Sequence, residues 1–328
     1  MTAVETTRPS EPALLMRVGG ELLGSFLICL ALYLMSTIGL TLYGPYMSFV
    51  ALATGLVYCA VTMMLSGFCA CQFNPAITVA AMLTSKTRVL DGVLAIVAQV
   101  VGALAAGALT VKVLLPTSST VTMTQWMSYV NNGFDDGSFS NTQLSQAGVS
   151  FGITAAIAVE VIAGLVIVGV AMRMIDNQGG LRPGYAAAMG VAYGACAAFA
   201  TPITGAALNP ARATGIAVFA ASEGLTWNPL GQLWVFWICP VLAAALVALP
   251  MIVAQMMKNA KSNPAPANDV EAEEVVDAES VDQTVDESTD AIAQADEVPA
   301  SADEHADAEV GDQQSDAESD TDHSVERD

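Results

Sequence analysis

Two Asn-Pro-Ala triplets, Asn74-Pro75-Ala76 and Asn209-Pro210-Ala211, are the residues of this chain with the clearest chemical meaning. Asparagine is among the best N-cap residues because its side-chain oxygen accepts a backbone N–H. Proline suits the first helical position, where its missing N–H costs nothing, and alanine is a good helix former. Each triplet therefore predicts the start of a helix whose capping asparagine keeps its NH2 group free to donate elsewhere.

The apolar stretches that begin at the triplets, residues 75–84 and 210–221, are only about half a membrane long. The residues before each cap must then be extended backbone at membrane depth. Such backbone is tolerated only where it is buried or lines a water-filled cavity. We expect these residues to line a pore with their carbonyl groups: Cys71, Gln72 and Phe73 before the first triplet, and Ala206, Ala207 and Leu208 before the second.

Arg212, Glu21 and Glu160 lie inside apolar stretches, where a charge is costly and usually functional. Arg212 directly follows the second triplet, whereas the equivalent residue of the first half is Ile77. A structural alternative is that Arg212 pairs with a carboxylate. Glu21 and Glu160 occupy similar places in the first and fourth apolar runs, so we expect hydrogen bonds to the triplet-bearing loops rather than a proton relay. Gln99 is expected to be a buried hydrogen-bonding partner.

The composition places these residues in a membrane. Apolar residues make up 54% of the chain and charged residues 13%, about half the charged fraction of a typical soluble protein. A spanning helix needs about 20 mostly apolar residues. Six runs of this kind are found, at residues 18–40, 47–67, 89–115, 149–172, 185–200 and 231–256, of which the fifth is the shortest.

Lysine and arginine orient the chain, because they concentrate in the cytoplasmic loops of membrane proteins. They precede the first run, lie between the second and third and between the fourth and fifth, and follow the sixth: Arg8, Arg17, Lys86, Arg88, Arg173, Arg182, Lys258 and Lys261. The other connections contain only Arg212, and a snorkelling side chain would explain Lys112 near the outer end of the third run. We therefore expect both termini in the cytoplasm.

The sequence also contains an internal repeat. An offset of 135 residues relates Asn74 to Asn209 and Gly55 to Gly190. Each half reads as two spans, a half-helix and a third span, so the second half must be inverted relative to the first. We expect an all-α membrane protein with six transmembrane helices and two re-entrant half-helices in an inverted 3+3 repeat. The positive ends of the half-helices would converge near the midplane, where such repeats place their solute site.

Composition divides the chain into three parts. Residues 1–17 are expected to be a cytoplasmic segment, and residues 18–257 the channel domain, with repeat halves at about 18–115 and 149–257. The polar connection at 116–148 is expected outside the cell. From residue 258 onward the chain has three basic and 23 acidic residues and no aromatic one, which predicts a disordered acidic tail. A solvated extension is the favoured interpretation of this tail, and a regulatory module is the alternative.

No residues suggest chemistry beyond conduction. The six cysteines lie within or beside apolar stretches, which argues against a disulfide framework or a zinc site. The membrane domain contains no histidine and no nucleophile-base-acid set. We expect no catalytic residues, metal, cofactor or nucleic-acid partner. Cys71 is the first-half equivalent of Ala206, so we expect it to face the inner vestibule and to react with mercurials.

These features resemble the aquaporin, or major intrinsic protein, family over about residues 16–256. The resemblance rests on Glu21-Leu22-Leu23-Gly24, Phe73-Asn74-Pro75-Ala76-Ile77-Thr78, Ala98-Gln99, Glu160, Thr204-Gly205, Asn209-Pro210-Ala211-Arg212, and Phe236-Trp237 with Pro240. It implies a homotetramer in the lipid bilayer of the cell membrane, with one pore per protomer and passive flow. It also implies an outer constriction at which Arg212 is a donor to the solute and a barrier to cations.

The predicted constriction differs from that of water-selective members, which carry an aromatic residue and a histidine opposite the arginine. Those positions fall on Thr54 and Ala197, and Ala206 is the fourth member. All three are small, so we expect a wider opening. Ala213 and Phe236-Trp237, in contrast, are typical of water channels rather than glycerol conductors.

The leading hypothesis is a passive channel for water and small uncharged solutes that excludes protons and ions. An alternative within the same class is a facilitator whose main solute is glycerol, another polyol or urea. A coupled secondary transporter is less favoured, because broken helices and inverted repeats also serve such proteins but the pore is nearly uncharged. A requirement for an ion gradient would distinguish that transporter from a channel.

Overall fold

The computed structural model describes residues 13–44 and 47–262. Within these ranges the chain is helical and no β-sheet is formed. Six helical stretches are long and apolar enough to cross a membrane: Leu14–Tyr43, Ser48–Leu65, Val89–Leu114, Ile153–Met174, Tyr185–Thr204 and Pro229–Ala260. The predicted fold class of six spanning helices is thereby confirmed.

The spanning stretches are built from α1 (Leu14–Leu34), α2 (Leu40–Tyr43), α3 (Met47–Leu65), α5 (Val89–Leu109), α8 (Ile153–Met174), α9 (Tyr185–Thr204) and α11 (Pro229–Ser262). A π-helical turn at Met35–Gly39 joins α1 to α2, and a second one, Thr110–Leu114, extends α5. Apolar residues occupy most positions around each spanning helix, as expected for a helix that faces lipid on one side and other helices on another.

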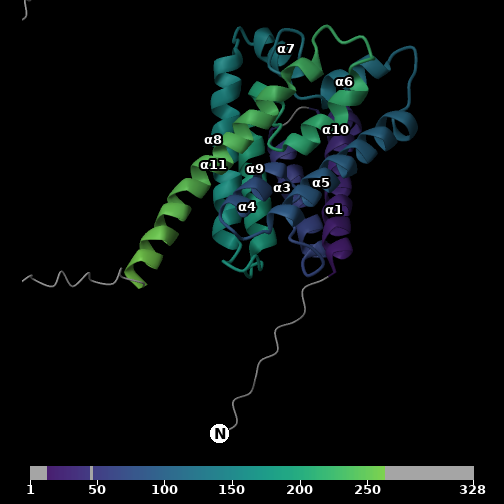
Figure 1. Cartoon of the computed structure of the whole chain (residues 1–328). Coiled ribbons are helices and arrows are strands. Elements are labelled where there is room, and N and C mark those ends of the chain that lie inside the picture. Colours follow the sequence, from purple (N-terminus) through teal and green to yellow (C-terminus); the bar gives the residue numbers. More distant parts are fainter. Residues whose placement is uncertain (1–12, 45–46, 263–328) are drawn as a thin grey trace, which may run out of the picture. The chain divides into compact units, whose positions relative to one another are not determined.

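Two short helices begin at the triplets. They are α4 (Pro75–Leu83) and α10 (Pro210–Ala220), and Figure 1 shows α10 in the upper part of the bundle and α4 in the lower part. Each half-helix packs against the last spanning helix of the opposite half, α4 against α11 and α10 against α5. The two halves therefore interlock and are not separate domains.

Equivalent helices of the two halves pack in equivalent ways. Helix α1 lies along α5, and α8 lies along α11, while α3 and α9 pack against each other across the pseudo-twofold axis. Gly55 of α3 and Gly190 of α9 meet at that crossing, where a Cβ built on Gly55 would lie 2.6 Å from the carbonyl oxygen of Gly190. Small residues at such crossings let two backbones approach closely.

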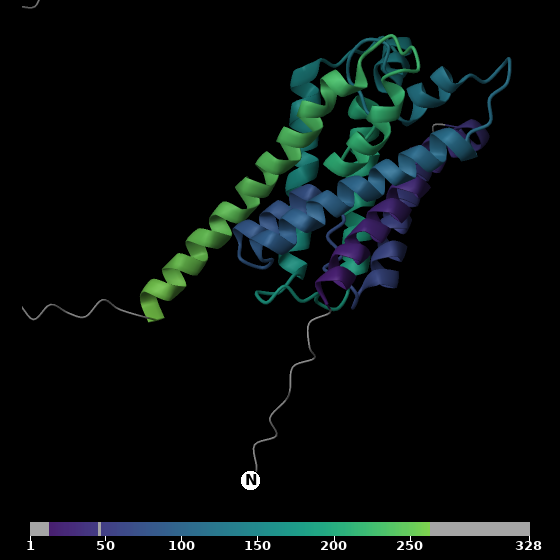
Figure 2. The ribbon, with the colours of Figure 1, turned by 45° about the vertical axis from the view of Figure 1, so that its right-hand side comes forward.

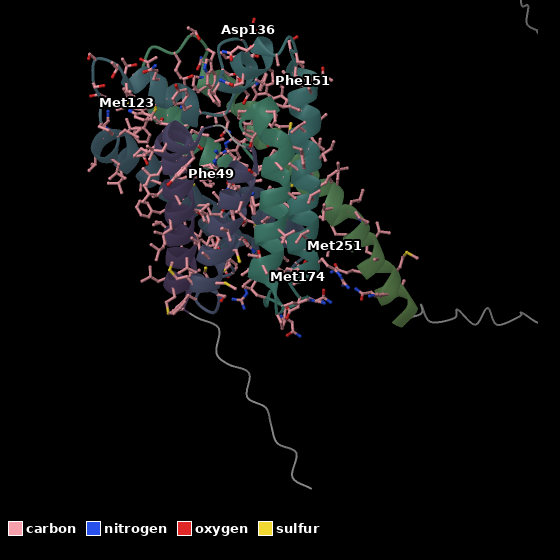
Figure 3. The ribbon with its side chains drawn as sticks, turned by 180° about the vertical axis from the view of Figure 1, so that it is seen from behind. Phe49, Met123, Asp136, Phe151, Met174 and Met251 are labelled. Atoms are coloured by element: carbon pink, nitrogen blue, oxygen red, sulfur yellow. The ribbon has the colours of Figure 1, made fainter. Side chains whose placement is uncertain are left out.

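The two ends of the bundle can be told apart by the residues that lie there and by the course of α11. Met123, Asp136 and Phe151 lie at one end, and Met174 lies at the other (Figure 3). Towards its C-terminus, α11 leans away from the other helices in both views (Figures 1 and 2). This segment contains Pro240 and Pro250, whose missing N–H groups each remove one helical hydrogen bond.

The structure corrects several predicted boundaries. The first span begins at Leu14 rather than at residue 18, and α9 is not short, because it continues past Pro202 to Thr204. A left-handed Gly205 ends α9 and donates its N–H to the carbonyl of Thr201, which is a typical helix C-terminus.

The two predicted polar regions also contain helix. The connection 116–148 carries α6 (Met123–Val130) and α7 (Phe139–Gln146), and α6 begins with a capping box between Thr122 and Gln125. Helix α11 continues to Ser262, so the predicted start of a disordered tail at residue 258 is wrong by at least five residues. Residues 1–12 and 263–328, and with them the rest of the predicted tail, lie outside the described residues.

Candidate functional site

The triplets cap the two half-helices. Asn74 has extended backbone, and its Oδ1 accepts a hydrogen bond from the backbone N–H of Ala76 at 2.9 Å. Asn209 has the same conformation and accepts from Ala211 at 3.0 Å and from Arg212 at 3.4 Å. The proline of each triplet occupies the first helical turn. The positive ends of both helices are therefore built from the residue types that favour them.

The two caps bind each other's loops. The amide nitrogen of Asn74 donates to the carbonyl oxygen of Leu208 at 2.9 Å, and that of Asn209 donates to the carbonyl oxygen of Phe73 at 2.7 Å. All four residues are at most 4% exposed. These reciprocal bonds join the half-helices head to head at the centre of the bundle.

A pair of tyrosines uses the remaining amide donors. The nitrogen of Asn74 also donates to the hydroxyl of Tyr193 at 2.8 Å, and that of Asn209 donates to the hydroxyl of Tyr58 at 3.2 Å. The NH2 group of each capping asparagine thus donates outside its own half-helix, as predicted, and in this conformation both of its hydrogens are used. Sequence analysis missed both tyrosines, although the 135-residue offset of the repeat relates Tyr58 to Tyr193.

The loops before the caps are not uniformly extended, which corrects the prediction for them. Alternate residues are left-handed, with φ of 48° at Cys71 and at Phe73, 51° at Ala206 and 56° at Leu208. Successive N–H groups in a backbone of alternating handedness can point to one side and form a concave site for an anion. The structure fills each of these sites with a buried carboxylate.

Glu21 of α1 fills the first site. Its carboxylate accepts from the backbone N–H groups of Gln72 at 2.9 Å and Phe73 at 2.8 Å. The amide nitrogen of Gln99 donates to the same carboxylate at 2.8 Å and to the hydroxyl of Thr78 at 3.0 Å. Glu21 is 2% exposed and Gln99 is fully buried, so these bonds are shielded from solvent.

Glu160 of α8 fills the second site in the same manner. Its carboxylate accepts from the backbone N–H groups of Ala207 and Leu208, both at 3.1 Å, and from the hydroxyl of Thr204 at 2.6 Å. Glu160 has no exposed surface. A hydroxyl from α9 thus takes the place that Gln99 holds in the first half.

A small cavity, here called the outer cavity, lies beside the second loop and has a volume of about 50 Å³. Thr54, Ala206 and Arg212 line it, as does Thr201 of α9. Ala197, the remaining member of the predicted constriction, has no exposed surface and is not part of this lining. Thr201 lies one helical turn further along α9 and donates its hydroxyl to the carbonyl of Ala197.

Arg212 is held by uncharged oxygen atoms. Its guanidinium donates to the side-chain oxygen of Asn132 at 3.1 Å and to the carbonyls of Ala206 and Ala207. The hydroxyl of Tyr33 binds the backbone carbonyl of Arg212 at 2.7 Å. A carboxylate is not among these partners, which counts against the structural alternative. Sequence analysis did not single out Asn132, because it lies in the connection that was predicted to be a polar loop.

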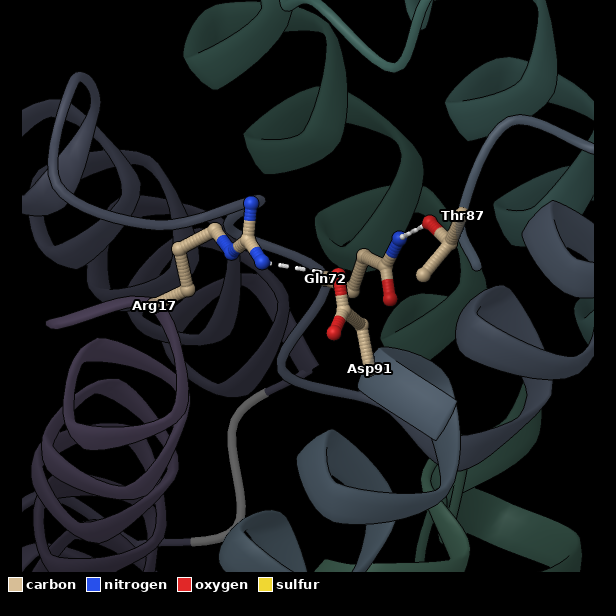
Figure 4. Close-up of polar contacts among 4 residues, drawn as sticks. All are labelled: Arg17, Gln72, Thr87 and Asp91. Atoms are coloured by element: carbon tan, nitrogen blue, oxygen red, sulfur yellow. Dashed lines mark hydrogen bonds and ion pairs between the residues drawn. The ribbon is translucent and has the colours of Figure 1, made fainter. Parts of the chain in front are cut away.

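A larger cavity of about 780 Å³, here called the inner cavity, opens near the start of α1. Arg17 and Asp91 form an ion pair of 2.8 Å at its wall, and the amide of Gln72 donates to the hydroxyl of Thr87 at 2.8 Å (Figure 4). Among the described residues, the side-chain oxygen of Gln72 is buried without a hydrogen-bond partner. Gln72 therefore contributes a side chain, and not only backbone, to the inner end of the first loop.

Lys86 ties two connections together at the same end of the bundle. Its ammonium group donates to the carbonyls of Met172 at 3.1 Å, of Ile175, and of Asp176 at 3.3 Å. These carbonyls lie at the C-terminal end of α8, where a cation is favoured by the helix dipole. Burial lowers the pKa of Lys86, and the charge of Arg182 lowers it further.

Cys69 and Cys71 form a pair of thiols beside the first loop, with their sulfur atoms 3.6 Å apart. Cys69 lines the inner cavity, whereas Cys71 is 2% exposed and is not part of that lining, which corrects the predicted orientation of Cys71. We expect Cys69→Ser to reduce inhibition of water flux by a water-soluble mercurial roughly tenfold or more, because exposure limits the reaction of a thiol. Cys239→Ser, deep in α11, is the matched control. Equal sensitivity of Cys69→Ser and the unmodified chain would contradict this assignment.

Known proteins resemble this chain in sequence and in fold. The family described as Major intrinsic protein matches residues 10–250. Aquaporin Z of Rhodopseudomonas palustris is 30% identical over 198 residues, which cover 60% of this chain and 75% of that protein. Aquaporin Z of Brucella melitensis is 27% identical over 205 residues, covering 61% and 79% respectively.

Among solved structures, the aquaglyceroporin from Plasmodium falciparum superposes with a TM-score of 0.57 and 16% identity, over 75% of this chain and all of the other. At this identity the likeness concerns the fold alone. The family match, in contrast, covers nearly all of the described helices. The chain therefore belongs to the major intrinsic protein family.

Proposed function

We propose that the chain forms a passive transmembrane channel for water and small uncharged solutes, and that its pore runs from the outer cavity past the capped half-helices to the inner cavity. The observation that carries this proposal is the reciprocal binding of Asn74 and Asn209 to the opposite loops. It brings two positive helix ends together at the midplane, where they oppose the passage of cations and protons. The curated relatives named aquaporin support water as the principal solute.

We further propose that the side chains around Arg212 form the outer selectivity constriction. Thr54 and Ala206 line the outer cavity, and their small side chains fill little of its space. The guanidinium supplies N–H donors and a fixed positive charge to a solute that enters. Ala197 does not line the outer cavity, and Thr201, whose hydroxyl binds the carbonyl of Ala197, takes its place in the proposed constriction. Solutes somewhat larger than water, such as glycerol or urea, are therefore included in the proposal.

Glu21 and Glu160 are proposed as supports that hold the pore loops in their backbone conformation, in which alternate residues are left-handed. Each accepts three hydrogen bonds in the buried interior, two of them from the loop backbone. Such an arrangement orients the loop carbonyls in the opposite direction, toward the pore axis. A proton relay would need a chain of exchangeable groups leading away from each carboxylate, whereas these carboxylates are engaged by the backbone.

We propose that the protein lies in the plasma membrane with both termini in the cytoplasm. The placement of charged residues supports this orientation. Lys86 and Arg17 lie at the inner cavity, and Asp136 lies at the opposite end of the bundle from Met174 (Figure 3). A basic cytoplasmic side agrees with this orientation. We propose a homotetramer with one pore per protomer on the basis of the family resemblance.

The test is osmotic shrinkage of proteoliposomes, run in parallel for water, glycerol and urea, with proton and potassium leak measured on the same vesicles. We expect faster water flux than in empty vesicles without added ion leak. Water flux equal to that of empty vesicles, or flux that is coupled to proton leak, would overturn the proposal.

Removing the charge of Arg212 should weaken ion exclusion. A unit charge about 5 Å from a passing cation contributes about 3 kcal/mol at an effective dielectric constant near 20, which corresponds to roughly a hundredfold difference in rate. We therefore expect Arg212→Val to raise the ratio of cation leak to water flux by on the order of ten- to a hundredfold. Lys112→Val removes an exposed charge from the outer end of α5's π-helical extension and should leave this ratio unchanged. An unchanged ratio in Arg212→Val would remove the barrier role from that residue.

A further inference from the structure

Tyr58 and Tyr193, here called the tyrosine pair, stack at the centre of the bundle. Their ring centroids are 3.3 Å apart and their planes differ by 5°. Tyr58 projects from α3 and Tyr193 from α9, so the pair spans the two halves of the repeat. Each hydroxyl binds the capping asparagine of the other half, at 2.8 Å for Tyr193 and Asn74 and at 3.2 Å for Tyr58 and Asn209.

The tyrosine pair borders the outer cavity. Tyr58 lines that cavity, whereas Tyr193 lines neither cavity. Both tyrosines and both capping asparagines are at most 2% exposed. Rings at van der Waals distance leave no room for a water molecule between them. In this conformation, therefore, a solute in the outer cavity meets the two rings before it reaches the asparagine amides.

The outer constriction, in contrast, retains open space. Thr54 and Ala206 are short side chains, and Arg212 is drawn toward Asn132 and the carbonyl of Ala206. A cavity of about 50 Å³ remains among these residues. Open space is thus present beside the arginine, whereas the stacked rings at the midplane leave none between them.

On the basis of the proposed channel function, we infer that the tyrosine pair is a second, size-selective element of this pore, in addition to the outer constriction around Arg212. Conduction requires the two rings to separate. The same movement withdraws the hydroxyls from Asn74 and Asn209, so each opening also frees two amide donors for the passing solute. Ring separation and solute binding at the midplane are therefore coupled, and the width that the rings allow decides which solutes follow water.

Two double variants separate the roles of ring and hydroxyl. Tyr58→Val with Tyr193→Val removes the rings, and we expect water flux to rise roughly tenfold or more, the factor that corresponds to losing one aromatic contact and two hydrogen bonds. Glycerol and urea flux should rise by a larger factor than water flux. Tyr58→Phe with Tyr193→Phe keeps the rings and frees the amides, so water flux should rise less and the ratio of glycerol to water should stay as in the unmodified chain.

Tyr43→Val is the matched control, because it removes the ring of a tyrosine at the end of α2 that is 60% exposed and lines neither cavity. We expect it to leave the ratio of glycerol to water unchanged. The inference is overturned if the valine variant stays within twofold of the unmodified chain for all solutes, or if Tyr43→Val changes the ratio more than the valine variant does. Folding is checked by elution as a single species in detergent. If the valine variant aggregates, the phenylalanine variant, which conserves packing, still tests whether the hydroxyls restrict the flux.

Failure of this inference can be told from failure of the channel proposal. If the unmodified chain conducts water and both double variants match it, the tyrosine pair is not selective and the channel proposal stands. If neither the unmodified chain nor any variant accelerates water flux, the channel proposal itself fails. If only the valine variant accelerates water flux, the unmodified chain fails the test of the channel proposal, whereas the inference that the two rings close this path is supported.

Discussion

Glu160→Leu is expected to abolish water flux, because it removes the support of the second pore loop. The carboxylate accepts three hydrogen bonds, from the hydroxyl of Thr204 and from the backbone N–H groups of Ala207 and Leu208. The hydroxyl of Thr204 also has the carbonyl of Ala200 as an acceptor at 3.2 Å, so two backbone N–H groups are left without a partner. Each such buried donor costs about 1–3 kcal/mol, so the variant loses roughly 2–6 kcal/mol. That loss is a large share of the free energy of unfolding of a typical domain. The measurements are thermal stability in detergent and osmotic flux in proteoliposomes.

Glu160→Gln is the graded control for this prediction. Its side-chain oxygen can still accept from Thr204 and Ala207, but its NH2 group then faces the N–H of Leu208, donor against donor. One bond is lost instead of three, so we expect a loss of about 1–3 kcal/mol and partial flux. Glu21→Gln should behave alike, because Glu21 is bound in the same way. A leucine variant as stable and active as the unmodified chain would show that the loop holds its shape without the carboxylate.

The sequence alone predicted the six spans, the inverted repeat and both half-helices, because each depends on local rules. Apolar runs of membrane length, capping chemistry and a fixed offset between repeats need no knowledge of distant contacts. Glu21 and Glu160 were predicted for a similar reason, since a buried carboxylate must find donors and each lies in a run that is otherwise apolar. The boundaries were less well predicted. Helix α9, for example, continues past Pro202 to Thr204 and ends at the left-handed Gly205.

The tyrosine pair, Asn132 and the orientation of Cys71 could not be predicted in this way. Each depends on which side chains meet across helices that are far apart in the sequence. Tyrosine is common in spanning helices, so Tyr58 is informative only together with Tyr193 and the repeat offset. The left-handed residues of the pore loops were missed because their conformation is imposed by the buried carboxylates and not by residue type, since four of four positions are residues other than glycine.

The crossing of α3 and α9 determines whether the tyrosine pair can form at all. Gly55 and Gly190 meet there, and each tyrosine follows its glycine by three residues, about one helical turn. A Cβ on Gly55 would lie 2.6 Å from the carbonyl oxygen of Gly190, and a Cβ on Gly190 would lie 2.8 Å from the carbonyl oxygen of Gly55. The obstruction in both directions is backbone, which cannot move aside as a flexible side chain can.

Gly55→Leu is therefore expected to force α3 and α9 apart, separate the tyrosine rings and destabilise the fold. Overpacking typically costs 1–3 kcal/mol, and a clash with backbone belongs at or above the upper end of that range, so we expect a loss of about 3 kcal/mol or more. Gly55→Ala should lose less, because only its Cβ must be accommodated. Thermal unfolding in detergent measures the loss, and proteoliposome flux shows whether the surviving protein conducts.

The matched control is Gly19→Ala in α1, where an added Cβ would have no atom within 4 Å. Alanine is favoured over glycine in a helix by about 1 kcal/mol, so this variant should be as stable as the unmodified chain or slightly more stable. The contrast between two glycine-to-alanine changes removes helix propensity as an explanation. If Gly55→Ala and Gly19→Ala unfold at the same temperature, α3 and α9 do not approach each other as closely as the structure shows. The close approach that permits Tyr58 to stack on Tyr193 would then be absent.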